Sequence, residues 1–190
     1  SNSLNGTSPL HQSIKFNNSD IATILVKNGA DFNLRDQERR GPLYSAAYNG
    51  LTQVVKILIS IGADINHTTK HGRTPLYTSS FNGHVEVVHM LVNNNASVNK
   101  ANNNGKTPLH AAVKEGHVET VKLLLENNAS VNIADNLYGN TPLFSHNIEI
   151  ASLLLENNAQ ANKVSTVGGI PPLYRAILAG NTEFAKQLIE

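Results

Sequence analysis

Cysteine is absent from this 190-residue chain. A disulfide scaffold is therefore excluded, and so is any zinc site built on thiolate ligands. An excess of charge of one sign is also lacking, because 15 Lys and Arg stand against 14 Asp and Glu. The chain as a whole is thus not an electrostatic attractor for nucleic acid.

Long hydrophobic runs are missing as well, since no apolar stretch approaches the roughly 20 residues that a membrane-spanning helix needs. The first ten residues, SNSLNGTSPL, lack the charged and then apolar pattern of a secretory signal peptide. We therefore expect an intracellular protein, in the simplest case a cytoplasmic one, that does not insert into membranes. Hydrophobic residues nevertheless make up 40% of the chain, which is enough for a folded core.

What the chain does contain is a proline-centred tetrad that recurs along its whole length. The copies read SPLH (8–11), GPLY (41–44), TPLY (74–77), TPLH (107–110), TPLF (141–144) and PPLY (171–174). The aligned prolines are 33, 33, 33, 34 and 30 residues apart. Each complete unit also ends in a related segment, such as LISIGADIN or LLENNASVN. Self-similarity at this period is the signature of a stacked repeat architecture.

The fourth unit shows how the sequence predicts local structure. A proline after Thr107 suits the first turn of a helix, where its missing N–H costs nothing and the hydroxyl can cap. Gly116 is a natural end for that short helix. A second helix follows, in which Val118, Val121 and Leu124 recur at helical spacing. Neither helix has enough apolar surface to be stable alone, so neighbouring units must stack and share a core.

In these features the chain resembles the ankyrin-repeat family over nearly its whole length. The motifs are the TPLH-type tetrads, the NGH and EGH triplets at 82–84 and 115–117, and the GADIN-type segments. The resemblance implies an all-α ankyrin-repeat solenoid of stacked helix-turn-helix pairs, with hairpin-like finger loops along one edge. It also implies that the fingers and the first helix of each pair form a concave face. We predict a single domain over residues 1–190, with repeats at about 7–39, 40–72, 73–105, 106–139, 140–169 and an incomplete 170–190.

The fifth unit departs from the pattern. Aligning residues 141–159 on residues 107–129 shows that four residues are missing from its first helix, which is about one helical turn. This deletion, near Ser145 and His146, should leave a notch in the concave wall. The last unit stops at Glu190, inside its second helix and without an obviously polar capping face. We infer that the chain was cut from a longer protein or that more structure follows.

Apolar residues flank the expected notch. Leu137 and Tyr138 lie at the tip of a finger with one extra residue, and Val167 and Ile170 lie on the next finger. In one interpretation, the notch and its apolar fingertips accept a side chain from a partner. In the other, the lengthened fingers fold inward and fill the space of the missing turn.

The histidines at first sight indicate a metal site or an acid–base site, because His110, Glu115 and His117 lie within eight positions of one another. The slots equivalent to His110 hold interchangeable residues in the other units, namely His11, Tyr44, Tyr77, Phe144 and Tyr174. A metal ligand or a catalytic base would not occupy such a slot. The family resemblance implies instead that these histidines make structural hydrogen bonds between neighbouring repeats.

Other signs of an active site are weak. His67 and His71 are four residues apart on a predicted finger, but a histidine pair without a third ligand is a poor indication of zinc. The sequence shows no nucleophile elbow, phosphate-binding loop or paired-carboxylate arrangement. We therefore predict no catalytic, cofactor-binding or metal-binding residues in this chain.

The end of each first helix is the most informative slot, and we call it the groove slot. It holds Lys15, Tyr48, Phe81 and Lys114 at steps of 33 residues, and Leu178 in the last unit. Polar residues one turn earlier indicate that this ridge faces solvent, and the family resemblance implies that it lines the concave groove. Tyr48 and Phe81 either bind a partner, as exposed aromatic residues do at hot spots, or pack on each other and on fingers. We predict that the groove slot and the adjacent Glu115 contact the partner.

Charge is unevenly distributed along the chain. Residues 1–106 carry ten Lys and Arg against six Asp and Glu, whereas residues 107–190 carry five against eight. Arg40, Arg73 and Lys106 occupy the same finger slot one repeat apart, and we call them the basic ladder. The ladder is either a solvated polar edge or an electrostatic strip for an acidic segment of a protein. No matching set of stacking aromatic residues accompanies it, which disfavours nucleic acid.

Together these features predict a non-enzymatic, monomeric module for protein–protein interaction, whose rigid groove holds a partner that the sequence does not identify. A hypothesis of a different class is the targeting or substrate-recruiting region of a larger enzyme or secreted effector. Its catalytic part would lie outside this chain, and an effector would be delivered into a host cell. The resemblance also implies that Asn33 or Asn66 can be hydroxylated.

Overall fold

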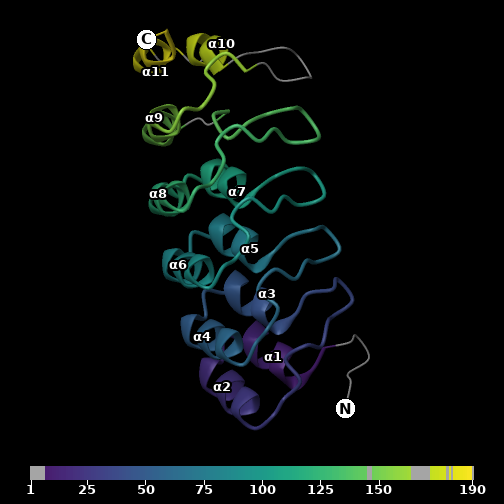
Figure 1. The fold of residues 1–190 in the computed structure, drawn as a ribbon. Coiled ribbons are helices and arrows are strands. Elements are labelled where there is room, and N and C mark those ends of the chain that lie inside the picture. Colours follow the sequence, from purple (N-terminus) through teal and green to yellow (C-terminus); the bar gives the residue numbers. More distant parts are fainter. Residues whose placement is uncertain (1–6, 145–146, 164–171, 179, 181, 190) are drawn as a thin grey trace.

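The computed structural model describes residues 7–144, 147–163, 172–178, 180 and 182–189, and these residues form eleven helices and no strand. The helices are α1 (Pro9–Lys15), α2 (Ser19–Lys27), α3 (Pro42–Tyr48), α4 (Thr52–Ser60), α5 (Pro75–Phe81), α6 (Val85–Asn93), α7 (Pro108–Glu115), α8 (Val118–Glu126), α9 (Ile148–Glu156), α10 (Pro172–Leu178) and α11 (Thr182–Ile189). Helices α1, α3, α5 and α7 stack in one row, and α2, α4, α6, α8, α9 and α11 stack in a second row (Figure 1). Finger loops project from the side of the first row. The predicted all-α solenoid of stacked helix pairs is confirmed.

Helices α1, α5 and α7 begin at a hydroxyl cap followed by proline, whereas α3 begins at Gly41 and Pro42 without a side-chain cap. Ser8, Thr74 and Thr107 each accept the backbone N–H three residues further on, at 3.0 to 3.4 Å. In the fourth unit the bond is reciprocal, because His110 Nδ1 accepts the N–H of Thr107 at 3.1 Å. Two of the orphan donors at the helix start are thereby satisfied, and proline needs no partner there.

The loop after each second helix turns through the left-handed region at one residue. That residue is Gly29 or Gly62 in the first two units, with φ of 79° and 85°. It is Asn95, Asn128 or Asn158 in the next three, with φ of 64°, 62° and 64°. Asparagine is among the non-glycine residues that tolerate this region best. Part of the asparagine richness of the chain therefore has a structural reason.

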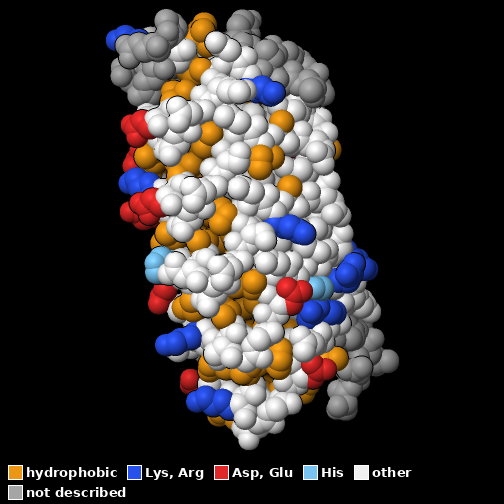
Figure 2. Space-filling model, in the orientation of Figure 1, with side chains coloured by type: hydrophobic (Ala, Val, Ile, Leu, Met, Phe, Trp, Pro, Cys, Tyr) orange, Lys and Arg blue, Asp and Glu red, His pale blue; other side chains and the backbone are white. Residues whose placement is uncertain are grey.

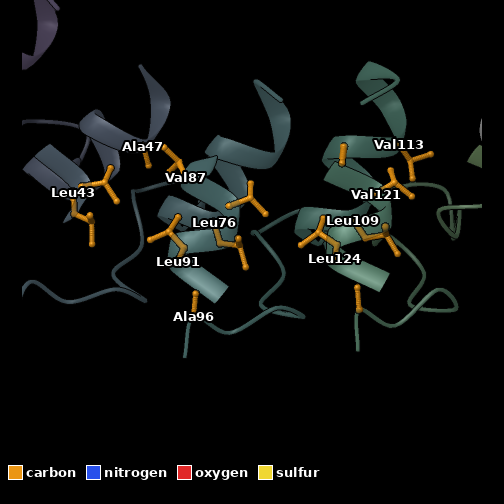
Figure 3. Close-up of a cluster of buried hydrophobic side chains, with 14 of the residues drawn as sticks. Leu43, Ala47, Leu76, Val87, Leu91, Ala96, Leu109, Val113, Val121 and Leu124 are labelled. Carbon is orange, nitrogen blue, oxygen red and sulfur yellow. The ribbon is translucent and has the colours of Figure 1, made fainter. Parts of the chain in front are cut away.

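The core is a continuous column of leucines shared between units. Leu76 and Leu109, from the tetrads, and Leu91 and Leu124, from the second helices, are at most 1% exposed (Figure 3). Leu143 and Leu154 repeat the pattern in the fifth unit and are fully buried. Full burial of such a side chain stabilises the fold by about 1.5–3 kcal/mol relative to exposure. Because each leucine contacts side chains of adjacent units, no unit can bury its apolar face alone.

Histidine rings connect successive units. Five of them donate Nε2–H to a backbone carbonyl about one repeat away: His11 to Arg40 at 3.2 Å, His67 to Arg39 at 2.9 Å, His84 to Tyr48 at 2.9 Å, His110 to Asn140 at 3.1 Å and His117 to Phe81 at 3.0 Å. Each bond joins a carbonyl at a helix or finger end to a ring of a neighbouring unit, and the carbonyls of Arg40, Tyr48 and Asn140 also accept a second N–H from the chain. The structural role that the sequence predicted for His110 and His117 is confirmed.

The fifth unit differs most from the others. Residues 141–144 form a turn, closed by the Phe144 N–H on the carbonyl of Thr141 at 3.1 Å, where the sequence predicted a shortened first helix. The physical reason is that a helix begins with an unfavourable turn, and the deletion leaves too little chain to extend it. Ser145 and His146 lie outside the described residues.

The left-handed turn predicts opposite effects for two substitutions at Asn128. Asn128→Ala should lower the free energy of unfolding by about 1 kcal/mol, because alanine tolerates a positive φ poorly. Asn128→Gly should leave it within about 0.5 kcal/mol of the wild type, since glycine adopts this φ freely. Urea unfolding followed by circular dichroism measures both. Equal destabilisation by alanine and glycine would show that the asparagine side chain, and not the backbone, matters.

The buried histidines predict a loss of stability in mild acid. Burial lowers the pKa of His11 and His110 below the ordinary value of 6.5. The unfolded chain then takes up protons at these rings before the folded chain does. The free energy of unfolding should therefore fall as pH drops below about 6.5, by at most about 1.4 kcal/mol per pH unit for each ring.

The matched variant is His110→Tyr, because the equivalent slot naturally holds Tyr44 and Tyr77. Urea midpoints between about pH 7.5 and pH 5 should change less in this variant than in the wild type. Parallel curves for the two proteins would contradict a contribution from His110.

Candidate protein-interaction surface

The groove slot lies at the C-terminal ends of the first helices. Tyr48 is the last residue of α3 and is 51% exposed. Phe81, the last residue of α5, is half-buried, and the ammonium group of Lys114 lies 5.5 Å from its ring centroid. The same ammonium group is 2.9 Å from a carboxylate oxygen of Glu115. The structure thus brings Phe81, Lys114 and Glu115 together in one cluster.

The first unit shows a residue that the sequence prediction left out. Lys15 lies 5.9 Å from the ring centroid of Phe16, and Phe16 is 74% exposed. The equivalent residues are Asn49 and Asn82, whose side-chain amides donate to carbonyls of the preceding unit at 3.1 Å. A phenylalanine cannot make that bond. The replacement of this asparagine by phenylalanine in the sequence was the signal that could have found it.

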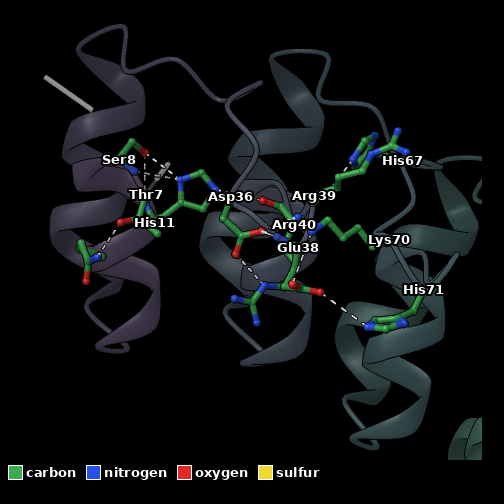
Figure 4. Close-up of polar contacts among 11 residues, drawn as sticks. Thr7, Ser8, His11, Asp36, Glu38, Arg39, Arg40, His67, Lys70 and His71 are labelled. Atoms are coloured by element: carbon green, nitrogen blue, oxygen red, sulfur yellow. Dashed lines mark hydrogen bonds and ion pairs between the residues drawn. The ribbon is translucent and has the colours of Figure 1, made fainter. Parts of the chain in front are cut away.

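The members of the basic ladder each have a contact within the chain. Arg40 Nε lies 2.6 Å from Asp36 Oδ2, and Lys106 Nζ lies 3.9 Å from Asp135 Oδ2 (Figure 4 shows the first pair). The guanidinium carbon of Arg73 is 5.8 Å from the ring centroid of Tyr77. The ladder is therefore partly neutralised and not a field of free positive charge.

Other charges around the ladder are interspersed in sign. Glu38 lies between Lys70 at 3.8 Å and His71 at 3.6 Å (Figure 4). Basic and acidic side chains also alternate on the face drawn in Figure 2. Burial raises the pKa of Tyr77 although Arg73 and Lys114 oppose the shift, so its hydroxyl stays neutral. Electrostatics at this edge is short-ranged and sensitive to salt.

A cavity of about 660 Å³ opens beside the turn at 141–144 of the fifth unit. Its wall is formed by residues of α7 and its two flanks, of the finger that follows α8, of the turn at 141–144 and of the N-cap of α9: Lys106, His110, Val113, Lys114, Glu115, Gly116, Asp135, Asn140, Thr141, Pro142, Phe144 and Asn147. We call this cavity the notch. Because Lys114 and Glu115 belong to it, the notch is continuous with the groove slot.

The fingertip beside the notch does not fill it. Leu137 and Tyr138 are 50% and 49% exposed, and neither contributes to the wall. Their N–H groups both donate to Asp135 Oδ1, at 3.2 and 2.8 Å, which holds the tip in a tight turn. Inward folding, one of the two interpretations of the sequence, is thus not seen for this finger. Val167, Ile170 and the side chain of Leu178 lie outside the described residues.

The described part of the chain offers no metal centre, since it contains no group of three or more His, Asp or Glu side chains placed to hold an ion. His67 Nε2 donates to the carbonyl of Arg39 at 2.9 Å, which is another contact between neighbouring fingers. Asn66 Oδ1 accepts the N–H of Ser97 at 2.8 Å, and so it too connects successive units. Asn33 donates its backbone N–H to Asp31 Oδ1 at 2.8 Å.

No helix among the described residues is both long and apolar enough to cross a membrane.

Comparison with known proteins agrees with this architecture. A family model described as ankyrin repeats, in three copies, matches residues 1–69 and 43–135. A relative in Schizosaccharomyces pombe, the ankyrin repeat-containing protein P1E11.10, is 42% identical over 40 residues. That match covers 21% of this chain and 19% of the relative, so it spans about a fifth of the relative's length. Ankyrin repeats are known modules of protein–protein interaction and are generally not enzymes. The chain belongs to the ankyrin-repeat family.

Proposed function

We propose that this chain is one ankyrin-repeat domain of six units, the last incomplete, that binds a protein partner in its concave groove and catalyses no reaction. The observation that carries this proposal is the row of side chains at the ends of α3, α5 and α7. Tyr48 is half exposed, and the cluster of Phe81, Lys114 and Glu115 follows one unit further on.

Tyr48 is the first contact that we assign. An exposed tyrosine combines a large apolar ring with a hydroxyl that can bond to a partner, and such residues dominate binding energies. The backbone that carries the Tyr48 side chain is fixed, because the Tyr48 carbonyl accepts N–H groups from His84 at 2.9 Å and from Asn82 at 3.1 Å. A site fixed before binding loses little conformational entropy when the partner arrives.

The cluster of Phe81, Lys114 and Glu115 is the second contact. Lys114 covers part of the Phe81 ring, so a partner meets an aromatic face together with a paired positive and negative group. Such a surface favours a segment that is apolar in the middle and polar at its margins. Lys15 beside Phe16 and the fingertip residues Leu137 and Tyr138 extend the surface at its two ends.

The basic ladder contributes orientation more than affinity. Arg40, Arg73 and Lys106 lie on fingers beside the groove, and exposed charges of this kind act mainly on the association rate. An acidic segment of the partner would compete with Asp36 for Arg40, which limits the gain in free energy. Arg73 has no carboxylate partner among the described residues and is therefore the most available member.

The groove predicts the effect of removing its aromatic side chains. The double variant Tyr48→Ala and Phe81→Ala should bind the partner captured by the wild type at least about tenfold more weakly. Truncation of a hot-spot residue costs about 1–2 kcal/mol or more of binding free energy. The matched control is Ile61→Ala with Val85→Ala, two side chains of similar exposure at the second-helix row. Affinity capture followed by calorimetry measures the difference. Unchanged binding, with melting curves that show intact folds, would exclude the groove.

The ladder predicts a salt effect on the rate of association. Raising the salt concentration from about 50 to 500 mM should slow association by about threefold or more, because exposed charges are screened over a few ångströms at high salt. Arg73→Gln should flatten this dependence, whereas Lys56→Gln on α4 should not. Surface plasmon resonance measures the association rates of the wild type and of both variants. An association rate that does not depend on salt concentration would exclude electrostatic steering.

A further inference from the structure

The same hydrogen bond recurs at the ends of α3 and α5. The carbonyl of Tyr48, at the end of α3, accepts Nε2–H of His84, and the carbonyl of Phe81, at the end of α5, accepts Nε2–H of His117. The donor in each case comes from the following unit. The chain therefore shows twice which group this position accepts, namely a planar ring with one N–H.

The ring in this position lies against a glycine. A Cβ atom added to Gly50 would come 2.8 Å from Nδ1 of His84, and one added to Gly83 would come 2.6 Å from Nδ1 of His117. Each glycine is in the left-handed region, with φ of 70°. The glycine thus gives the imidazole its space while it ends the helix.

The end of α7 has the same glycine, but no ring of the described residues lies on it. Gly116 has φ of 79°, and a Cβ atom added there would meet no atom of the described residues within 4 Å. The carbonyl of Lys114 receives no side-chain N–H from the described part of the chain, in contrast to the carbonyls of Tyr48 and Phe81. The slot of the missing histidine holds Asn147, which instead caps α9 by accepting the N–H of Ile150 at 3.2 Å.

The charged groups of the notch are already paired. Lys106 faces Asp135 at 3.9 Å, and Lys114 faces Glu115 at 2.9 Å. Both nitrogens of His110 are used as well, Nδ1 by Thr107 and Nε2 by the carbonyl of Asn140. A carboxylate or an ammonium group entering the notch would find no unpaired counter-charge. It would lose its hydration without gaining an ion pair in exchange.

The remaining wall suits a ring. Val113, Pro142 and Phe144 supply apolar surface next to Gly116, and the volume of about 660 Å³ is typical of sites that hold a ligand group. A neutral heteroaromatic ring can lie on this surface while its single N–H reaches a backbone carbonyl. This combination is the one that His84 and His117 show within the chain.

We propose that the notch is a specificity pocket for a histidine of the partner protein, whose imidazole lies on Gly116 and donates its N–H to the carbonyl of Lys114. The partner thereby supplies the contact that the next repeat supplies elsewhere in the stack. This inference rests on the proposed function, since the notch extends the groove at Lys114 and Glu115.

The direct test uses imidazole itself with the full chain. At about pH 8 the free ring is neutral. Titration followed by NMR should shift the amide resonances around Gly116 saturably, with a dissociation constant on the order of 10 mM for so small a fragment. Nuclear Overhauser effects from the ring protons to the Gly116 α-protons should place the probe in the wild-type notch. Shifts that do not saturate, or that spread over the surface, would overturn the proposal.

The matched variants are Gly116→Asn and Gly29→Asn. Both glycines have φ of 79° and open space at the Cβ position, so the backbone strain is the same, and asparagine is the residue that tolerates it best. Gly29 follows α2 and lies far from the notch along the chain. Gly116→Asn should weaken imidazole binding at least about tenfold, whereas Gly29→Asn should leave it unchanged. Equal binding by the two variants would overturn the proposal.

Acetate and guanidinium serve as competing probes under the same conditions. Tighter binding of acetate would make the notch a carboxylate site served by Lys106 and Lys114, and tighter binding of guanidinium would make it a cation site at the end of α7. Either result would overturn the histidine assignment. The proposed groove is tested separately. If the partner needs Tyr48 and Phe81 but imidazole does not bind, the groove proposal stands and only the proposal for the notch is overturned.

Discussion

Stacking of one helix pair on the next is the interaction on which the rest of the structure depends. The helices have seven to nine residues, a length at which an isolated helix is not stable in water. They persist because leucines such as Leu76 and Leu109 are buried between units, and because histidine rings connect the ends of neighbouring helices. Each unit is therefore both held by its neighbours and required by them. A surface made of many stacked units is rigid for the same reason.

The same stacking aligns the side chains that can bind a partner. Tyr48, Phe81 and Lys114 are far apart in sequence, yet they occupy one edge because each stands at the end of a first helix. The period of 33 residues places them there, and their chemistry plays no part in the placement. Selection can consequently vary these positions without disturbing the core. The fifth unit breaks the period, and the break exposes the end of α7 and opens the notch beside it. Local rules of a fold are often violated where function is located.

Much of the fold could be predicted because its signals are local and repeated. Proline after a hydroxyl residue marks the starts of α1, α5 and α7, and glycine or asparagine marks the turn through positive φ after each of α2, α4, α6, α8 and α9. The structural role of His110 and His117 followed from the aromatic residues that share the slot of His110 and from the family resemblance, before any distance was known. The fifth unit was harder, since a deletion of four residues does not say whether a helix shortens or disappears. Residues 141–144 form a turn because helix formation is cooperative, and a count of residues does not include that cooperativity.

The sequence by itself determined the period, the starts of the proline-led first helices and the residues that occupy the groove slot. These follow from steric preferences of single residues and from spacing, which do not depend on the rest of the molecule. Only the tertiary structure decided how those side chains are used. It covers the ring of Phe81 with Lys114, pairs Lys106 with the buried Asp135 and leaves Phe16 exposed. It also places the rings of His84 and His117 on Gly50 and Gly83, whereas no described residue places a ring on Gly116. Such pairings depend on distances between groups on different units, and those distances exist only once the units have stacked.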